Sequence, residues 1–135
     1  MTAVLIDSNV LLDIMTEDPQ WFTWSAVALE AAADTSRLVI NPIIYAGVSV
    51  RYSRIEDLEA ALPVGLIDRE AIPYAAAFLA AKVFRADRRR GGVKRSPLPD
   101  CFLGAHAAVA GYRLLTRDTG RYRSYFPTLN MICPG

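Results

Sequence analysis

Three aspartates of the sequence are placed where they could act together, at one edge of a predicted sheet. Asp7 directly follows a short apolar run, residues 3–6. Asp118 follows a second run, residues 113–116, and Asp100 starts the helix that leads into it. The carboxyl ends of parallel strands meet at one edge of an open α/β sheet, where ligands bind. We therefore expect the three side chains to share that edge.

Three carboxylates in one place repel each other. At a separation of about 5 Å and an effective dielectric constant of about 20, each pair costs on the order of 3 kcal/mol, so the cluster needs a bound cation or shared protons. Hard oxygen ligands of this kind suit Mg²⁺ or Mn²⁺. The alternative is that Asp7 and Asp100 only cap helices and that Asp118 is a turn residue.

The elements that would position these residues alternate between strands and helices. Strands are predicted at 3–6, 37–40, 64–67, 113–116 and 129–133. Helices are predicted at 9–15, 21–33, 43–52, 55–62, from Asp68 or Arg69 to about Arg85, and at 97–110, with a turn or short helix at 119–125. Asn41 before Pro42 is a helix start, and Gly111 is a helix stop. This alternation predicts an α/β fold with a mainly parallel sheet covered on both faces.

Length and composition predict a single domain over residues 1–135. The mean hydropathy of +0.21 and 53% hydrophobic residues exceed those of a usual soluble domain, so we expect a homodimer or a bound partner to cover part of the surface. Its apolar helices are too interrupted to span a bilayer, and no signal peptide is expected before the first strand. Cys101 and Cys133 have no metal-like spacing, which predicts reduced thiols in a cytoplasmic protein.

Four segments of the chain, in this order, resemble PIN domains and, among them, the VapC-like ribonuclease toxins of toxin-antitoxin pairs. They are Ile6–Asn9 with Leu11–Asp13, Asn41–Ala46, Pro99–Ala107 and Leu115–Asp118. The resemblance implies a three-layer α/β/α domain that binds Mg²⁺ or Mn²⁺ and cleaves RNA by metal-assisted hydrolysis. It also implies a cognate antitoxin as partner.

Carried over position by position, the resemblance assigns Asp7, Asp100 and Asp118 to the family's acidic residues, as catalytic residues and metal ligands. Asn9 and Thr116 match the polar residues that support them. Asp13 lies away from the end of the strand, and we expect it to be a surface or capping residue.

Gly47 departs from the family pattern, which usually has a glutamate after the segment 41–46. Glycine inside a predicted helix costs roughly 1 kcal/mol relative to alanine, and nothing local in the sequence requires it. One interpretation is a hinge or close backbone packing. The other, which we favour, is an inactivating substitution, engineered or selected, that removes one acidic ligand and weakens metal binding and cleavage.

Several other residues have a functional and a structural interpretation. The basic run 85–95 and the arginines after the last motif offer phosphate contacts for RNA, or simply a solvated surface. The arginines concerned are Arg88, Arg89, Arg90 and Arg117, with Arg121 and Arg123 as an extension. His106, the only histidine, is expected to be a packed or hydrogen-bonded helix residue. The aromatic group Trp21, Phe22 and Trp24 is core by default, or part of an antitoxin groove.

Two further classes of protein compete with the ribonuclease interpretation. A non-catalytic module that binds RNA or an antitoxin would keep the fold and lose the chemistry. A Mg²⁺-dependent phosphatase on a similar sheet would need a second aspartate two residues after Asp7, where this sequence has Asn9.

Overall fold

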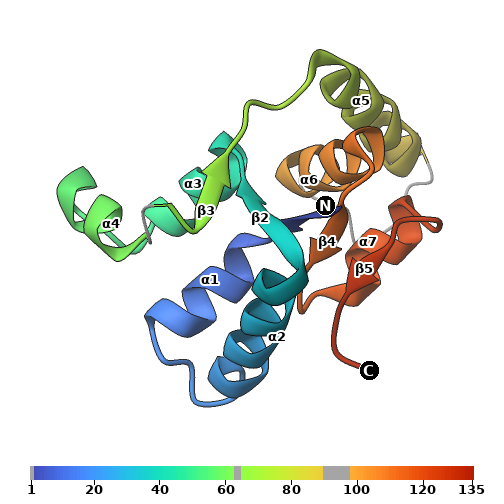
Figure 1. The fold of residues 1–135 in the computed structure, drawn as a ribbon. Helices are drawn as coiled ribbons and strands as arrows, with labels where there is room; N and C mark the ends of the chain where they lie inside the picture. The colour runs from blue at the N-terminus through green and yellow to red at the C-terminus, as the bar shows by residue number, and fades with distance from the viewer. Residues whose placement is uncertain (1, 63–64, 90–97) are drawn as a thin grey trace.

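The strands of this protein form one parallel sheet. A computed structural model describes residues 2–62, 65–89 and 98–135, except for the side chains of 87–89 (Figure 1). Its strands are β1 (Thr2–Ile6), β2 (Ser36–Ile40), β3 (Ile67–Arg69), β4 (Arg113–Leu115) and β5 (Met131–Ile132). They lie in the order β3-β2-β1-β4-β5, and all neighbouring strands are parallel. All carboxyl ends therefore meet at one edge, as predicted.

Helices cover both faces of this sheet, which gives the three-layer α/β/α architecture (Figure 1). They are α1 (Ser8–Met15), α2 (Phe22–Thr35), α3 (Pro42–Ser49), α4 (Ile55–Ala61), α5 (Tyr74–Arg89), α6 (Leu98–Ala110) and α7 (Thr119–Tyr125). On one side α1 packs against α2, with α3 beside α1. On the other side α5 packs against α6, which also contacts α7. None of the described helices is both long enough and apolar enough to cross a membrane.

The central strand β1 is buried in the core and positions Asp7, which directly follows it. Its residues from Ala3 to Ile6 are buried, as expected for an apolar strand that is covered on both faces. Ile6 pairs with Leu115 of β4, and the backbone N–H of Asp7 donates to the carbonyl of Leu115 at 2.9 Å. This register places the residues that follow β1 and β4 side by side.

The start of α3 and the end of α6 lie where the sequence predicts them. The Asn41 side chain accepts a hydrogen bond from the Ile44 N–H at 3.0 Å, and Pro42 occupies the first turn of α3. Gly111 has a φ of +73° directly after α6, a conformation that favours glycine. Both predictions are confirmed. Cys101 and Cys133 are not joined to each other, also as predicted.

The predicted boundaries are wrong between β3 and α5. Asp68 and Arg69 do not open a helix but end β3, which pairs with Leu38–Ile40 of β2. The helix begins only at Tyr74, because Pro73 disfavours a helical conformation for the residue before it. It then continues to Arg89, four residues beyond the predicted end, through residues that are mostly good helix formers.

Candidate active site at the carboxyl edge of the sheet

Asp7 is held by hydrogen bonds from three side chains. It stands at the N-cap position of α1 but makes no capping hydrogen bond with its side chain, and it is only 6% exposed. Its Oδ2 atom accepts from Thr116 Oγ1 at 2.9 Å and Tyr122 Oη at 3.0 Å, with Asn9 Nδ2 at 3.4 Å. A cap alone therefore does not account for this buried aspartate.

Asn9 and Thr116 tie the two strand ends together beside Asp7. Thr116 is fully buried, and its Oγ1 accepts a hydrogen bond from the backbone N–H of Asp118 at 3.0 Å. Asn9 Nδ2 lies 3.3 Å from the same oxygen. The hydroxyl of Thr116 thus links Asp7 to Asp118, which agrees with the supporting position that the resemblance gives it.

The charges of the aspartates affect the pKa values of the buried groups at this edge. Burial raises the pKa of the Asp7 carboxyl, and the charge of Asp100 raises it further, against the hydrogen bonds from Thr116 and Tyr122. Burial likewise raises the pKa of the Tyr122 hydroxyl, to which the charges of all three aspartates contribute. The fields of Asp7, Asp100 and Asp118 therefore overlap at this one buried hydroxyl.

Arg121 stands between the other two aspartates. Its Nη1 lies 2.7 Å from Oδ2 of Asp100, in the first turn of α6, and its Nε lies 3.2 Å from Oδ2 of Asp118. Sequence analysis assigned Arg121 only to a phosphate-binding surface and missed these ion pairs. The spacing of Asp118 and Arg121, three residues apart at the start of a helix, was the available indication.

The carboxylates at this edge fit a hard divalent cation by chemistry, since every donor is an oxygen. Within the described ranges, however, no three His, Cys, Asp or Glu side chains already lie together closely enough to hold a metal ion. Among the described residues, the guanidinium of Arg121 is the cation that pairs with both Asp100 and Asp118. A bound ion would therefore require the side chains around Arg121 to rearrange.

Asp13 is buried rather than on the surface, so its expected role as a surface or capping residue is wrong. It is 3% exposed, and its Oδ2 accepts from Ser25 Oγ at 2.7 Å and Arg117 Nε at 2.8 Å. Asp13 lies one helical turn from the buried Val10, so both residues share one face of α1. That periodicity was the indication in the sequence.

Arg117 pairs with Asp13 and also contacts an aromatic ring. Its guanidinium carbon lies 5.4 Å from the centroid of the Trp21 ring, a cation-π distance. Trp21 in turn packs edge-on against Trp24 with ring centroids 6.2 Å apart, and Phe22 is 37% exposed. The guanidinium of Arg117 thus has partners within the protein, which argues against its predicted contact with RNA.

His106 is a buried, hydrogen-bonded helix residue, which confirms the prediction. Asn41 Oδ1 is already used by the Ile44 N–H, so the Asn41 amide must donate to His106 Nδ1, 2.9 Å away. That nitrogen is then unprotonated and the imidazole neutral. Burial lowers the pKa of His106 and favours the same state. It has no contact with the three aspartates among the hydrogen bonds described here.

Gly47 lies where α3 passes close to α1. A Cβ atom added there would stand 2.6 Å from Oγ and 2.8 Å from Cβ of Ser8, distances that a real side chain does not tolerate without movement. The structure therefore supplies a packing reason for glycine that the sequence did not reveal. Position 47 therefore lies against Ser8, the residue that directly follows Asp7.

The predicted basic surface is only partly described. Arg88 and Arg89 end helix α5, but their side chains, like Arg90 and the rest of 90–97, lie outside the described residues. Arg123 is exposed, and its Nη2 lies 3.8 Å from the sulfur of Cys133.

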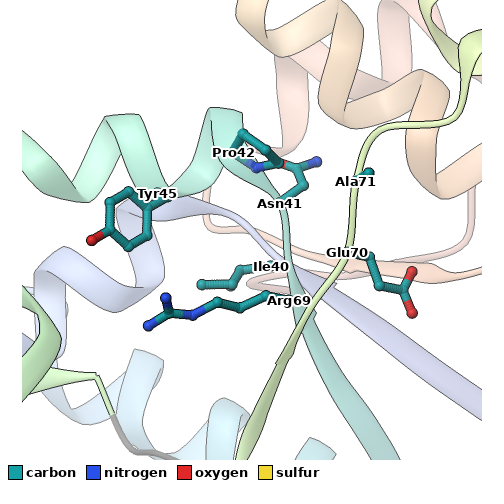
Figure 2. Close-up of a pocket in the computed structure, with 7 residues that line it drawn as sticks. All are labelled: Ile40, Asn41, Pro42, Tyr45, Arg69, Glu70 and Ala71. Atoms are coloured by element: carbon teal, nitrogen blue, oxygen red, sulfur yellow. The ribbon is translucent and has the colours of Figure 1, made fainter.

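A cavity of about 430 Å³ opens at the ends of β2 and β3, and none of the three aspartates lines it (Figure 2). Its lining residues are Ile40, Asn41, Pro42, Tyr45, Arg69, Glu70 and Ala71. The polar groups in its wall are already paired: Arg69 and Tyr45 both bond Glu59, at 2.9 and 2.6 Å. The cavity therefore offers little to a polar ligand, and the candidate site remains the aspartate edge.

Comparison with known proteins supports the fold at the level of the whole chain. The chain is similar to a VapBC2 chain from Rickettsia felis, solved bound to a promoter DNA fragment (TM-score 0.76, 14% identity, 99% of this chain and 100% of that chain). It is also similar to a VapBC-1 chain from nontypeable Haemophilus influenzae (0.73, 15%, 98% and 98%) and to a chain of a toxin-antitoxin complex from Klebsiella pneumoniae (0.68, 20%, 96% and 95%). No curated protein sequence matches significantly. The sequence profile of the PIN domain matches residues 4–126, and the chain belongs to the PIN domain family.

Proposed function

We propose that this chain is a metal-dependent endoribonuclease toxin of the VapC type, neutralised by a cognate antitoxin and weakened in this copy by Gly47. The observation that carries the proposal is the geometry of the carboxyl edge: the Thr116 hydroxyl donates to Asp7 and accepts from the Asp118 N–H, and Arg121 pairs with both Asp118 and Asp100. PIN domains of the VapC type are nucleases, and the similar chain from Klebsiella pneumoniae comes from a toxin-antitoxin complex.

In this mechanism Asp7, Asp100 and Asp118 would hold Mg²⁺ or Mn²⁺, which would supply an activated water and stabilise negative charge on the phosphate. The hydroxyls of Thr116 and Tyr122 fix the orientation of the Asp7 carboxylate, because both donate to the same oxygen, Oδ2. They also compensate part of the cost of keeping that carboxylate charged in a buried position.

The rest of the proposal concerns partners. RNA contacts Arg88, Arg89 and Arg90, which precede Asp100 in the sequence, and the antitoxin covers the aromatic group at the start of α2. The protein acts in the cytoplasm as a single domain, residues 1–135, and as a homodimer. A partner is consistent with the partly exposed Phe22 and with Val27, which is 62% exposed on the same helix.

A second candidate is a non-catalytic module that binds RNA or an antitoxin. Two observations favour it: the glycine at position 47, and the lack of a ready-made group of metal ligands in the described part of the chain. Metal binding separates it from the enzyme.

Manganese titration of the purified protein tests the proposal. We expect Mn²⁺ at about 100 times its dissociation constant to raise the free energy of unfolding by about 2.7 kcal/mol. We also expect weak cleavage of RNA that depends on Mg²⁺. Asp7→Asn should abolish both effects, because the neutral amide is a poor ligand for a hard cation. The matched control is Asp57→Asn, the same change at an exposed position of α4. A parent protein whose melting temperature ignores Mn²⁺ would favour the binding module.

The same Asp7→Asn variant has a predicted pH dependence in the absence of metal. The folded pKa of Asp7 is raised above its unfolded value of 3.8, so its contribution to stability is present below pH 3.8 and lost as the pH rises through the folded pKa. Asp7→Asn mimics the protonated acid and should melt at a higher temperature than the parent at neutral pH, where the parent has to keep a buried carboxylate charged. The difference should shrink as the pH falls toward 3.8. A lower melting temperature at neutral pH would contradict this.

A further inference from the structure

Arg121 joins two elements that come together only in the fold. Its side chain is 52% exposed and reaches Asp100, 21 residues away on α6, and Asp118 at the start of its own helix. It uses two different nitrogens, Nη1 and Nε, so one guanidinium binds both carboxylates at once. Lysine, with a single nitrogen, has no equivalent fork.

We infer that Arg121 is an internal competitor of the metal ion, which takes the cation's place between Asp100 and Asp118 and has to leave when the ion binds. This inference rests on the proposed metal-dependent function. It assigns a role to a residue that is not one of the proposed metal ligands.

The competition follows from charge and exposure. Without a cation, the carboxylates of Asp100 and Asp118 would stand unneutralised at the edge where Thr116 connects Asp118 to the buried Asp7. Arg121 removes this repulsion in the metal-free protein. Half of the Arg121 side chain is exposed, so its guanidinium can return to water at low cost. The ion pairs therefore neutralise Asp100 and Asp118 in the metal-free protein but are weak enough to break when a metal ion binds.

A positioning role would have the opposite effect on metal binding. If Arg121 held the two carboxylates in the geometry that the ion requires, its removal would loosen them and weaken binding. A general effect of positive charge near the site would appear for any neighbouring arginine. Arg123, on the same helix and without a carboxylate partner among the described contacts, measures that general effect.

The experiment is calorimetric titration of Mn²⁺ into the parent protein and into Arg121→Gln, Arg121→Lys and Arg123→Gln. Two partly exposed ion pairs predict that Arg121→Gln binds Mn²⁺ about 5–30 times more tightly than the parent. Arg123→Gln should change affinity by less than about twofold, and Arg121→Lys should fall between parent and Arg121→Gln. Without metal, Arg121→Gln should melt at a lower temperature than Arg123→Gln.

The outcomes separate this inference from the proposed function. If Arg121→Gln binds Mn²⁺ with the same affinity as the parent, or with a lower affinity, the competitor role is wrong and the proposed metal site still stands. Binding by Arg121→Gln alone would support it strongly. If no variant binds Mn²⁺, both the inference and the metal-dependent function fail.

Discussion

Replacement of Gly47 by glutamate is expected to raise Mg²⁺-dependent RNA cleavage about 10–100-fold over the parent chain, the range typical of a residue that supports a metal site. The reason is position: residue 47 packs on Ser8, the neighbour of Asp7, so a carboxylate there would join the three-aspartate edge. Gly47→Gln is the matched control, since it has the same size and no charge. Cleavage of a labelled RNA with and without EDTA measures the effect.

Packing sets a cost on the same replacement. A side chain at position 47 begins with a Cβ that Ser8 obstructs through both its Oγ and its Cβ. We expect Gly47→Glu and Gly47→Gln to lose about 1–3 kcal/mol of stability alike, as overpacked sites do. Adding Ser8→Gly removes both obstructing atoms and should recover most of that loss, whereas Ser8→Ala removes only the oxygen and should recover less.

These variants test the two interpretations of Gly47 separately. If glutamate cleaves RNA no faster than glutamine, with or without Ser8→Gly, the missing-ligand hypothesis is wrong and Gly47 is a packing residue. A stability cost that Ser8→Gly does not relieve would instead contradict the packing account. The two effects are independent, so both interpretations of Gly47 can hold together.

Most elements of the fold were predictable because their determinants are local. β1 is a continuous apolar run, and α3 starts at an asparagine followed by proline, so both could be read from neighbouring residues. The extension of β3 over Asp68 and Arg69 could not, because it depends on their pairing with β2, whereas Pro73 was a local indication that α5 begins later. Arg37 of β2 lies 2.8 Å from Asp68 and 31 residues away in sequence, a contact that no local pattern contains.

In the candidate site, too, some residues could be predicted from the sequence and others could not. Asp7 and Asp118 could be placed because each follows a strand, and the order of strands then brings them to one edge. The partners of Arg121 and Asp13 could not, because they depend on side-chain directions after the helices have packed. Asp13 and Arg117 are 104 residues apart, and only the pairing of β1 with β4 brings them together.

Arg117 is expected to be the most stabilising of the charged residues near the site. Arg117→Met leaves the carboxylate of Asp13, which is 3% exposed, without its cationic partner; among the side chains that the structure describes, the Ser25 hydroxyl remains to donate to it. Losing one partner of a buried ion pair costs about 3–5 kcal/mol, and the partial exposure of Arg117 lowers the expected loss to about 2–4 kcal/mol. Urea unfolding measures it, with the exposed Arg123→Met as control.

A double replacement tests whether the loss comes from the stranded charge. Asp13→Leu with Arg117→Met removes both charges and keeps apolar volume, so it should recover much of the stability that Arg117→Met loses. Arg117 also stacks on Trp21, and that contact is lost in both variants, which should shift the tryptophan emission equally. An Arg117→Met protein as stable as Arg123→Met would mean that water, not Arg117, stabilises Asp13. The junction between the aspartate edge and the α1–α2 pair would then be looser than its geometry indicates.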